Sequence, residues 1–495
     1  MNGRVSDSQT AEGAEADYRP DPARWRVLAV LLVTMFMSLI DVSIVNVVLP
    51  SIQGSLGATE SEIQWVLTGY ALTFGVVLVA AGRAGDVFGR GPLFIFGVAL
   101  FTLSSVASGL APNPVALDIA RFSQGIGSGL ISPQVLGMMQ QYFRGAERGR
   151  AYGALGTVVG FSVAVGPLIG GLMIQLLGPE IGWRFTFLVN VPVGTTAIVL
   201  GLRWFPRPLF TSRKRAGTAA EVARSRHAKD LDPVGTMLLG LGVLTLLLPF
   251  VQGRDSPWTW WLLPAGLLVI GLWVGWERAY HRGGRSPMVD LGLFAIRSFS
   301  LGTLIAGLYF MGVTSIWVLV AIYVQDGMGL SALQAGLLGL PAALCAAGAA
   351  HLAGKRVIEY GRKIVIAGIV CAVFAMASSI VVVQLSAAGR IGIWWLLATL
   401  SFAGIAQGAI ISPNQALTLM EVPLGQSGSA GGVMQTAQRI GAATGIAVIT
   451  GIFFAVLAAS DWDTAISAGF AAIAVVALAT LAVAVADQRR RGRGT

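Results

Sequence analysis

The sequence predicts an all-α polytopic membrane protein, and three observations lead to this fold class. Only 12% of the 495 residues are charged, against about 25% in soluble domains, and the mean hydropathy is +0.73. Apolar segments long enough to cross a hydrocarbon layer of about 30 Å recur along the whole chain. Basic residues gather in alternate connections between these segments. We therefore expect a bundle of transmembrane helices with a fixed orientation.

Fourteen apolar segments can be distinguished, each with about the length of one transmembrane helix. The first contains a single charged residue, Asp41, and the preceding residues lack the apolar core of a signal peptide, so we expect this span to be retained. In chain order the segments lie at 27–49, 63–82, 93–111, 116–138, 151–177, 186–205, 233–252, 259–276, 299–324, 332–353, 364–385, 391–414, 429–457 and 464–486.

The positions of the 34 Lys and Arg residues predict that both termini are cytoplasmic. With that orientation 29 of them lie on the cytoplasmic side, three (Arg184, Arg254 and Arg390) lie outside, and Arg121 and Arg439 fall within spans. This asymmetry follows the positive-inside rule. The net charge of +10 is therefore interpreted as a topology signal next to anionic lipid, and a nucleic-acid partner is not expected.

A repeat divides the chain into two halves. Ile131-Ser132-Pro133-Gln134 recurs as Ile411-Ser412-Pro413-Asn414 at an offset of 280 residues, and the Gly82–Arg90 loop matches Gly354–Arg362 at an offset of 272. Parallel halves of this kind place a substrate site between them near the bilayer midplane. The predicted regions are a disordered cytoplasmic tail (1–26), an N-terminal six-helix bundle (27–205), a basic cytoplasmic loop (206–232), two extra linker helices (233–276), a cytoplasmic connector (277–298), a C-terminal six-helix bundle (299–486) and a basic cytoplasmic tail (487–495).

Asp41 and Arg121 are the predicted proton-coupling residues. A charged side chain inside a membrane is costly and usually functional, and helix rise places these two at comparable depth. An arginine beside a carboxylate favours its charged form, and separating the two favours proton uptake. The alternative is a static ion pair between Arg121 and Asp118, which lies three residues earlier on the same helix.

Two glycine-rich stretches are predicted to control conformational change. The loop after the second span would act as a hinge or latch, although an ordinary tight turn with inside-positive charge would explain it too, especially in its second copy. In the fifth span, small residues permit close helix packing and the proline bends the helix. The conformational residues are Gly82, Asp86, Gly89, Arg90, Gly166, Pro167, Gly170 and Gly171.

These motifs together resemble the fourteen-span drug:proton antiporter family of the major facilitator superfamily. The resemblance implies a multidrug efflux protein in which the first-span acid, the fourth-span arginine and the glycine-proline helix exchange protons for substrate. The matching stretches are Leu39–Asp41 with Asn46 and Pro50, Gly82–Arg90, Arg121 with Gln124-Gly125, Gly166–Gly171, Gly182–Phe185 with Asn190–Pro192, Gly329–Ser331 with Ala335–Pro341, and Arg439–Gly441.

The chain departs from the family pattern in two respects. Val87 and Gly91 stand where the family loop usually carries basic residues, and spans ten and thirteen lack the acids that help some members bind cationic drugs. Arg439, near mid-membrane in span thirteen, is interpreted either as an anion-tolerant substrate or gating contact, or as a packing residue bonded to backbone carbonyls.

The remaining substrate-cavity candidates are aromatic and amide side chains within the spans, because such residues suit bulky amphiphiles, although each would also fit a lipid-facing or core position. They are Asn46, Gln64, Trp65, Tyr70, Gln124, Tyr309, Trp317, Gln407, Asn414 and Gln435, with Arg439 added.

The sequence thus predicts proton-coupled efflux of hydrophobic or amphiphilic drug-like compounds across the bacterial inner membrane, with antibiotic resistance as its consequence. The alternative is export of an endogenous lipid, siderophore or self-made antibiotic by the same mechanism. We expect no enzyme, since no catalytic constellation lies at one depth, and no metal or cofactor, since three His and two Cys form no ligand motif. The expected partners are the small-molecule substrate, protons and membrane lipids, and we expect a monomer.

Overall fold

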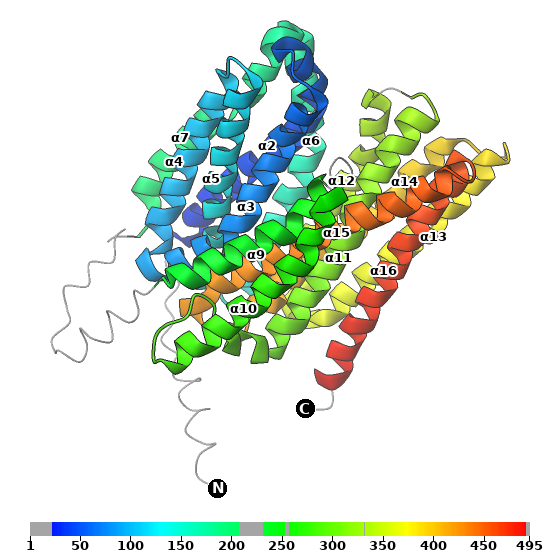
Figure 1. Ribbon diagram of the computed structural model, residues 1–495. Coiled ribbons are helices and arrows are strands. Elements are labelled where there is room, and N and C mark those ends of the chain that lie inside the picture. The colour runs from blue at the N-terminus through cyan, green and yellow to red at the C-terminus, as the bar shows by residue number, and fades with distance from the viewer. Residues whose placement is uncertain (1–21, 207–230, 253–256, 331, 492–495) are drawn as a thin grey trace, which may run out of the picture.

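A computed structural model describes residues 22–206, 231–252, 257–330 and 332–491. All regular structure in these residues is helical (Figure 1). Most of the predicted N-terminal tail and basic loop, the end of the C-terminal tail, and Arg254 lie outside the described residues.

The first six long helices follow one another closely. Thr59 and Glu62 form a capping box at the start of α3, and Asn113 accepts a hydrogen bond from the Ala116 amide at the start of α5. Gly89, at φ 104°, separates α3 from α4. These helices are α2 (Arg24–Leu56), α3 (Glu60–Phe88), α4 (Arg90–Gly109), α5 (Pro114–Tyr142), α6 (Gly145–Leu188) and α7 (Asn190–Trp204).

Eight further long helices complete the described chain. Short 3₁₀ helices precede α10, α11, α14 and α15, and a π-helical turn, Tyr323–Gly327, follows α11. The long helices are α9 (Pro233–Gln252), α10 (Leu262–Arg282), α11 (Arg297–Ile322), α12 (Ala332–Tyr360), α13 (Arg362–Ala387), α14 (Leu396–Leu419), α15 (Ser427–Leu457) and α16 (Trp462–Arg491).

Twelve helical segments of the described chain are long and apolar enough to cross a membrane, whereas the sequence predicts fourteen. The difference arises at two places. The polar α5, which buries Arg121, Gln124 and Gln134, is not among the twelve, and α6 and α7 count together as one 60-residue segment, Gly145–Trp204. Gly178, at φ 77°, interrupts the helical backbone within that segment.

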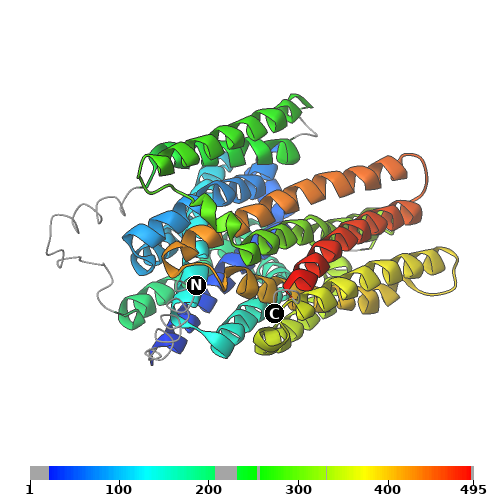
Figure 2. The ribbon, with the colours of Figure 1, turned by 90° about the horizontal axis from the view of Figure 1, so that it is seen from below.

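The long helices form two groups with a pair beside them. We call α2–α7 the first group and α11–α16 the second group. Within the first group α2 packs on α6, and α3 and α4 pack on α5; within the second, α12 packs on α14 and α11 on α15. The groups meet where α6 crosses α12 and α3 crosses α15. Beside them α9 packs against α3 and α15, and α10 packs on α9 (Figures 1 and 2).

Glycine makes the two crossings between the groups close. A Cβ atom on Gly354 of α12 would lie 2.3 Å from the Gly153 Cα of α6, and one on Gly82 of α3 would lie 2.2 Å from the Gly428 carbonyl oxygen of α15. Both crossings lie toward the end of the molecule where α16 ends, and the ribbons of the groups diverge toward the opposite end (Figure 1). Large apolar side chains such as Leu103 are exposed on the outer helices, as a lipid-facing surface requires.

Candidate transport site

The acidic group of Asp41 lies inside the first group, in a polar cluster supplied by four helices. Asp41 on α2 is only 1% exposed. Its Oδ2 accepts from Arg121 Nη1 at 2.6 Å, and its Oδ1 accepts from Gln124 Nε2 at 2.9 Å and from Asn190 Nδ2 at 2.8 Å. Ser105 on α4 completes the cluster by accepting from Gln124 at 2.8 Å. The buried carboxylate is therefore held by one cation and two amides.

Arg121 is held from several sides. Its Nε donates to the Val66 carbonyl at 2.9 Å, its Nη1 also donates to Gln124 Oε1 at 2.6 Å, and its Cζ lies 4.4 Å from the Tyr70 ring centroid. Within the described chain its ion-pair partner is Asp41, not Asp118, so the alternative of a local static bridge is wrong for this structure. The guanidinium fork uses separate N–H groups for the acid and the backbone carbonyl.

Two members of this cluster were not predicted as site residues. Ser105 and Asn190 lie in the apolar segments 93–111 and 186–205, and Asn190 is predicted only as part of a family motif. A buried polar residue in an apolar segment is the signal that could have identified them. What the sequence could not supply is the helix packing that turns both side chains toward Asp41.

Asp86 and Arg90 connect the two groups at the α3–α15 crossing. Asp86 accepts from the Gly428 and Ser429 amides at 3.0 and 2.9 Å and from the Ser429 hydroxyl at 3.0 Å, so its carboxylate caps the first turn of α15. Arg90 pairs with Asp86 at 2.8 Å and donates to the Gly137 carbonyl at 3.0 Å and to the Leu424 carbonyl. This turn therefore joins α3 and α5 to the second group.

The second copy of the loop behaves differently. Arg362 donates to Asp487 of α16 at 2.9 Å and to the Asn414 side chain, while Asn414 donates to the Gly302 carbonyl at 2.9 Å. Arg297 lies 3.7 Å from the same Asp487. All of these residues belong to the second group, so in this structure the Gly361-Arg362 turn ties that group together and not to the other.

The glycines of α6 serve two different interfaces. Gly166 and Gly170 face α2, where added Cβ atoms would lie 2.4 Å from Ser43 Cβ and 3.4 Å from Ile44 Cγ2. Pro167 lies within the helix between them. Gly171 differs from its neighbours, because an added Cβ would meet nothing within 4 Å. The earlier glycines, such as Gly153, instead approach α12 of the second group.

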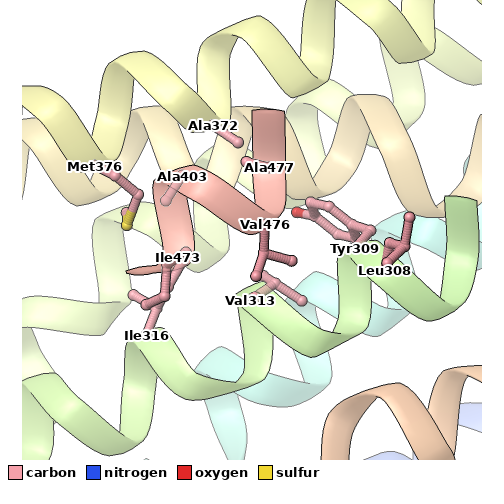
Figure 3. Close-up of a pocket in the computed structure, with 11 residues that line it drawn as sticks. Leu308, Tyr309, Val313, Ile316, Ala372, Met376, Ala403, Ile473, Val476 and Ala477 are labelled. Atoms are coloured by element: carbon pink, nitrogen blue, oxygen red, sulfur yellow. The ribbon is translucent and has the colours of Figure 1, made fainter. Parts of the chain in front are cut away.

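Three of the predicted cavity residues are buried within one group or the other. Gln124 is part of the Asp41 cluster, and Asn414 bonds Arg362 and Gly302 inside the second group. Tyr309 lines an apolar pocket with about 330 Å³ of free space among α11, α13, α14 and α16, and so within the second group (Figure 3). Each of these side chains packs in the interior of one group. Residue type alone cannot distinguish such a position from one that lines a substrate cavity.

The other first-group candidates are divided between core and surface. Tyr70 is buried against Arg121, and its hydroxyl lies 3.3 Å from that of Ser38. Trp65 packs against Phe122, with ring centroids 5.9 Å apart. Asn46 and Gln64 are exposed, and the Asn46 amide donates to Val42 of its own helix.

The second-group candidates lie closer to the boundary between the groups. Gln407 lines a small pocket that α6, α12 and α14 share, with about 220 Å³ of free space. Trp317 on α11 lies near Gly339 on α12, where an added Cβ would come within 3.4 Å of the indole. Gln435 is buried on α15, whereas Arg439 is exposed and its Cζ lies 4.4 Å from the Phe74 ring centroid on α3.

A buried acid–arginine pair in one of two pseudo-repeated helix groups, joined by close glycine crossings, defines a membrane transporter. Residues 31–446 match the family model described as Major Facilitator Superfamily, and the chain belongs to this superfamily. It is a multi-pass membrane protein of the inner membrane and a transporter, not an enzyme.

Relatives and solved structures agree with this assignment. The chain is 32% identical to a probable actinorhodin transporter of Streptomyces coelicolor over 91% of this chain and 76% of that protein. It is 31% identical to a puromycin resistance protein of Streptomyces alboniger over 87% and 82%. The fold is similar to the human organic anion transporter MFSD10, with a TM-score of 0.67 and 15% identity, over 94% of this chain and 100% of that one.

Proposed function

We propose that this protein is a proton-coupled antiporter that exports hydrophobic or amphiphilic drug-like compounds by alternating access. The observation that carries the proposal is the buried Asp41–Arg121 pair. Each charge compensates the other inside the membrane, so a movement that separates them requires the carboxylate to take up a proton or find another cation. Relatives whose names denote antibiotic transport and resistance support the direction of transport and the kind of cargo.

The proposed topology has fourteen spans with both termini in the cytoplasm. The segment Gly145–Trp204 would be about 90 Å long as a straight helix, three times the hydrocarbon thickness, and its break at Gly178 supports two crossings. The 29-residue α5 would span about 44 Å, and its polar side chains face inward. In this scheme 27–205 and 299–486 form the two bundles, and 233–276 forms the linker helices.

With this orientation, Asp86 and Arg90 form a cytoplasmic latch. Their bonds to Gly428, Ser429 and Leu424 must break before the cytoplasmic ends of the bundles separate. Since these bonds are intact in the structure, the proposal assigns it to the state in which the cytoplasmic ends of the bundles are together. Because α6 packs closely on α2 at Gly166, a movement of α6 would carry α2 and its Asp41 with it.

Proteoliposomes test the proposal directly. The full chain is reconstituted, a pH gradient is imposed, and uptake of radiolabelled puromycin is followed with and without a protonophore. We expect uptake that depends on the gradient and is absent in Asp41→Asn. Uptake that is equal with and without the gradient would contradict proton coupling.

The second candidate function is export of an endogenous lipid, siderophore or self-made antibiotic. The actinorhodin transporter relative favours it, since that name denotes a specific compound and not a range of drugs. A drug-susceptibility panel on cells lacking or overproducing the protein separates the two. Resistance to several unrelated drugs favours the first function, and unchanged susceptibility to all favours the second.

A further inference from the structure

Arg439 places an accessible positive charge between the two groups, halfway along a membrane helix. It lies 12 residues into α15, about 18 Å from the start of the helix. The side chain is exposed, yet its Cζ lies 4.4 Å from the Phe74 ring centroid on α3 of the first group. The guanidinium therefore borders space between the groups and is not enclosed by either of them.

No carboxylate of the described chain lies within 4 Å of Arg439. Asp41 lies in the cluster inside the first group, where Arg121 already holds it. A guanidinium cannot lose its proton under these conditions, and a charge in the membrane interior requires a partner. Phe74 offers only the modest attraction of a ring face.

A packing role would require Arg439 to donate to backbone carbonyls, but it makes no hydrogen bond to the residues that the structure describes. Gln435 lies one turn earlier on the same side of α15, and Gln438 is adjacent. Within the described chain neither amide side chain has a hydrogen-bond partner. This part of α15 thus presents several unused N–H donors opposite the aromatic Phe74.

We propose that Arg439 binds the negatively charged group of the cargo and so selects carboxylate- or sulfonate-bearing compounds over uncharged ones. The inference deepens the proposed efflux function and rests on it. An Arg contact to such a group is charge-assisted, while the buried ring of Phe74, which also packs on Tyr70, positions the guanidinium from α3. A site lined by a carboxylate would select cations instead. Within the described chain no carboxylate lies within 4 Å of Arg439.

A matched pair of fluorescent probes tests the inference. 8-Anilinonaphthalene-1-sulfonate and N-phenyl-1-naphthylamine share their rings, and only the first carries a sulfonate. Binding of each is titrated to the purified full chain in phosphatidylcholine nanodiscs, for wild type, Arg439→Gln, Arg439→Lys and Arg390→Gln. Arg390 is an exposed arginine in the connection between α13 and α14, so its replacement removes the same charge away from the site.

We expect Arg439→Gln to weaken sulfonate binding about tenfold, as loss of a charge-assisted contact does, and to change binding of the neutral probe less than twofold. Arg439→Lys should keep most of the preference, and Arg390→Gln all of it. Equal loss of both probes in Arg439→Gln, or no preference in wild type, overturns the inference. Because binding needs no gradient, uptake that is independent of the gradient in the proteoliposome test would contradict proton coupling and leave the anion site standing.

Discussion

The first and second groups carry the same sequence repeat, yet their interiors differ in chemistry. The offset of 272 residues relates Asp41 to Val313, and the offset of 280 relates Gln124 to Gly404, the neighbour of Ala403. Val313 and Ala403 line the apolar pocket in the second group (Figure 3). Where the first group holds a charged cluster, the second holds a pocket with apolar walls and the phenol of Tyr309. If the protein exchanges protons as proposed, the comparison places the exchanging carboxylate in the first group.

The two Gly-Arg turns differ in the same way. Arg90 bonds to Leu424 of the other group, whereas Arg362 bonds to Asp487 and Asn414 of its own. In the proposed transport cycle the bonds of the first turn must break, whereas those of the second turn stay within one group. Repeated sequence therefore does not imply repeated function.

The largest expected effect is that of Asp41→Asn. The amide keeps the size of the side chain but cannot exchange a proton, so substrate-induced proton release should vanish while expression and folding persist. Proton release from purified protein is measured in weakly buffered detergent solution after substrate is added. Release equal to that of wild type would place the exchanging group elsewhere.

Arg121→Lys should reduce the initial rate of efflux at least tenfold, although the charge is kept. A lysine ammonium cannot donate to Asp41, Gln124 and the Val66 carbonyl in the geometry of the guanidinium fork. Efflux from everted membrane vesicles gives the rate. A normal rate would mean that charge alone suffices.

Asp487→Asn should lower stability with little effect on conformational equilibrium. Removing a buried partner of Arg362 leaves an uncompensated charge, which typically costs about 3–5 kcal/mol. The melting temperature of the purified protein is the measurement. If it is unchanged while transport is lost, the second turn is a moving part after all.

Asp86→Asn should release α15 from the first group, because Asp86 accepts hydrogen bonds from Gly428 and Ser429 across the α3–α15 crossing. Removing the carboxylate from the first turn of α15 should cost about 1 kcal/mol, equivalent to roughly a fivefold change in population. Ser412, whose hydroxyl donates to the Tyr152 carbonyl across the α6–α14 contact at 2.6 Å, is replaced by Cys to report opening by alkylation, in a background lacking Cys345 and Cys371. Asp487→Asn serves as the control, and equal alkylation in both variants would remove the contrast.

Gly312→Ala should have the smallest effect. Its Cβ would lie 3.4 Å from Ile473 Cγ2, an ordinary contact at the edge of the second-group pocket. We expect a stability gain of about 0.5–1 kcal/mol and unchanged proton release. A loss of proton release would show that the second interior takes part in coupling.

The sequence by itself determined the helical membrane fold, the repeat, and the two charged residues that meet in the first group. These features depend on local properties of the sequence, namely hydropathy, spacing and an acid in an apolar run. In lipid the backbone N–H and C=O groups must hydrogen-bond within the chain, and a helix satisfies them locally. The sequence also singled out Asp86 and Arg90, though not their partners on α15.

Helix packing determines which polar side chains meet. Gln124 and Asn414, predicted to line a cavity, are drawn into separate buried networks, and Asn190 joins Asp41 from 149 residues away. Which side of a helix faces which neighbour depends on crossings such as that of Gly153 and Gly354, which involve residues far apart in the chain. A local sequence pattern contains no information about those contacts. The contacts determine which partner each polar group binds.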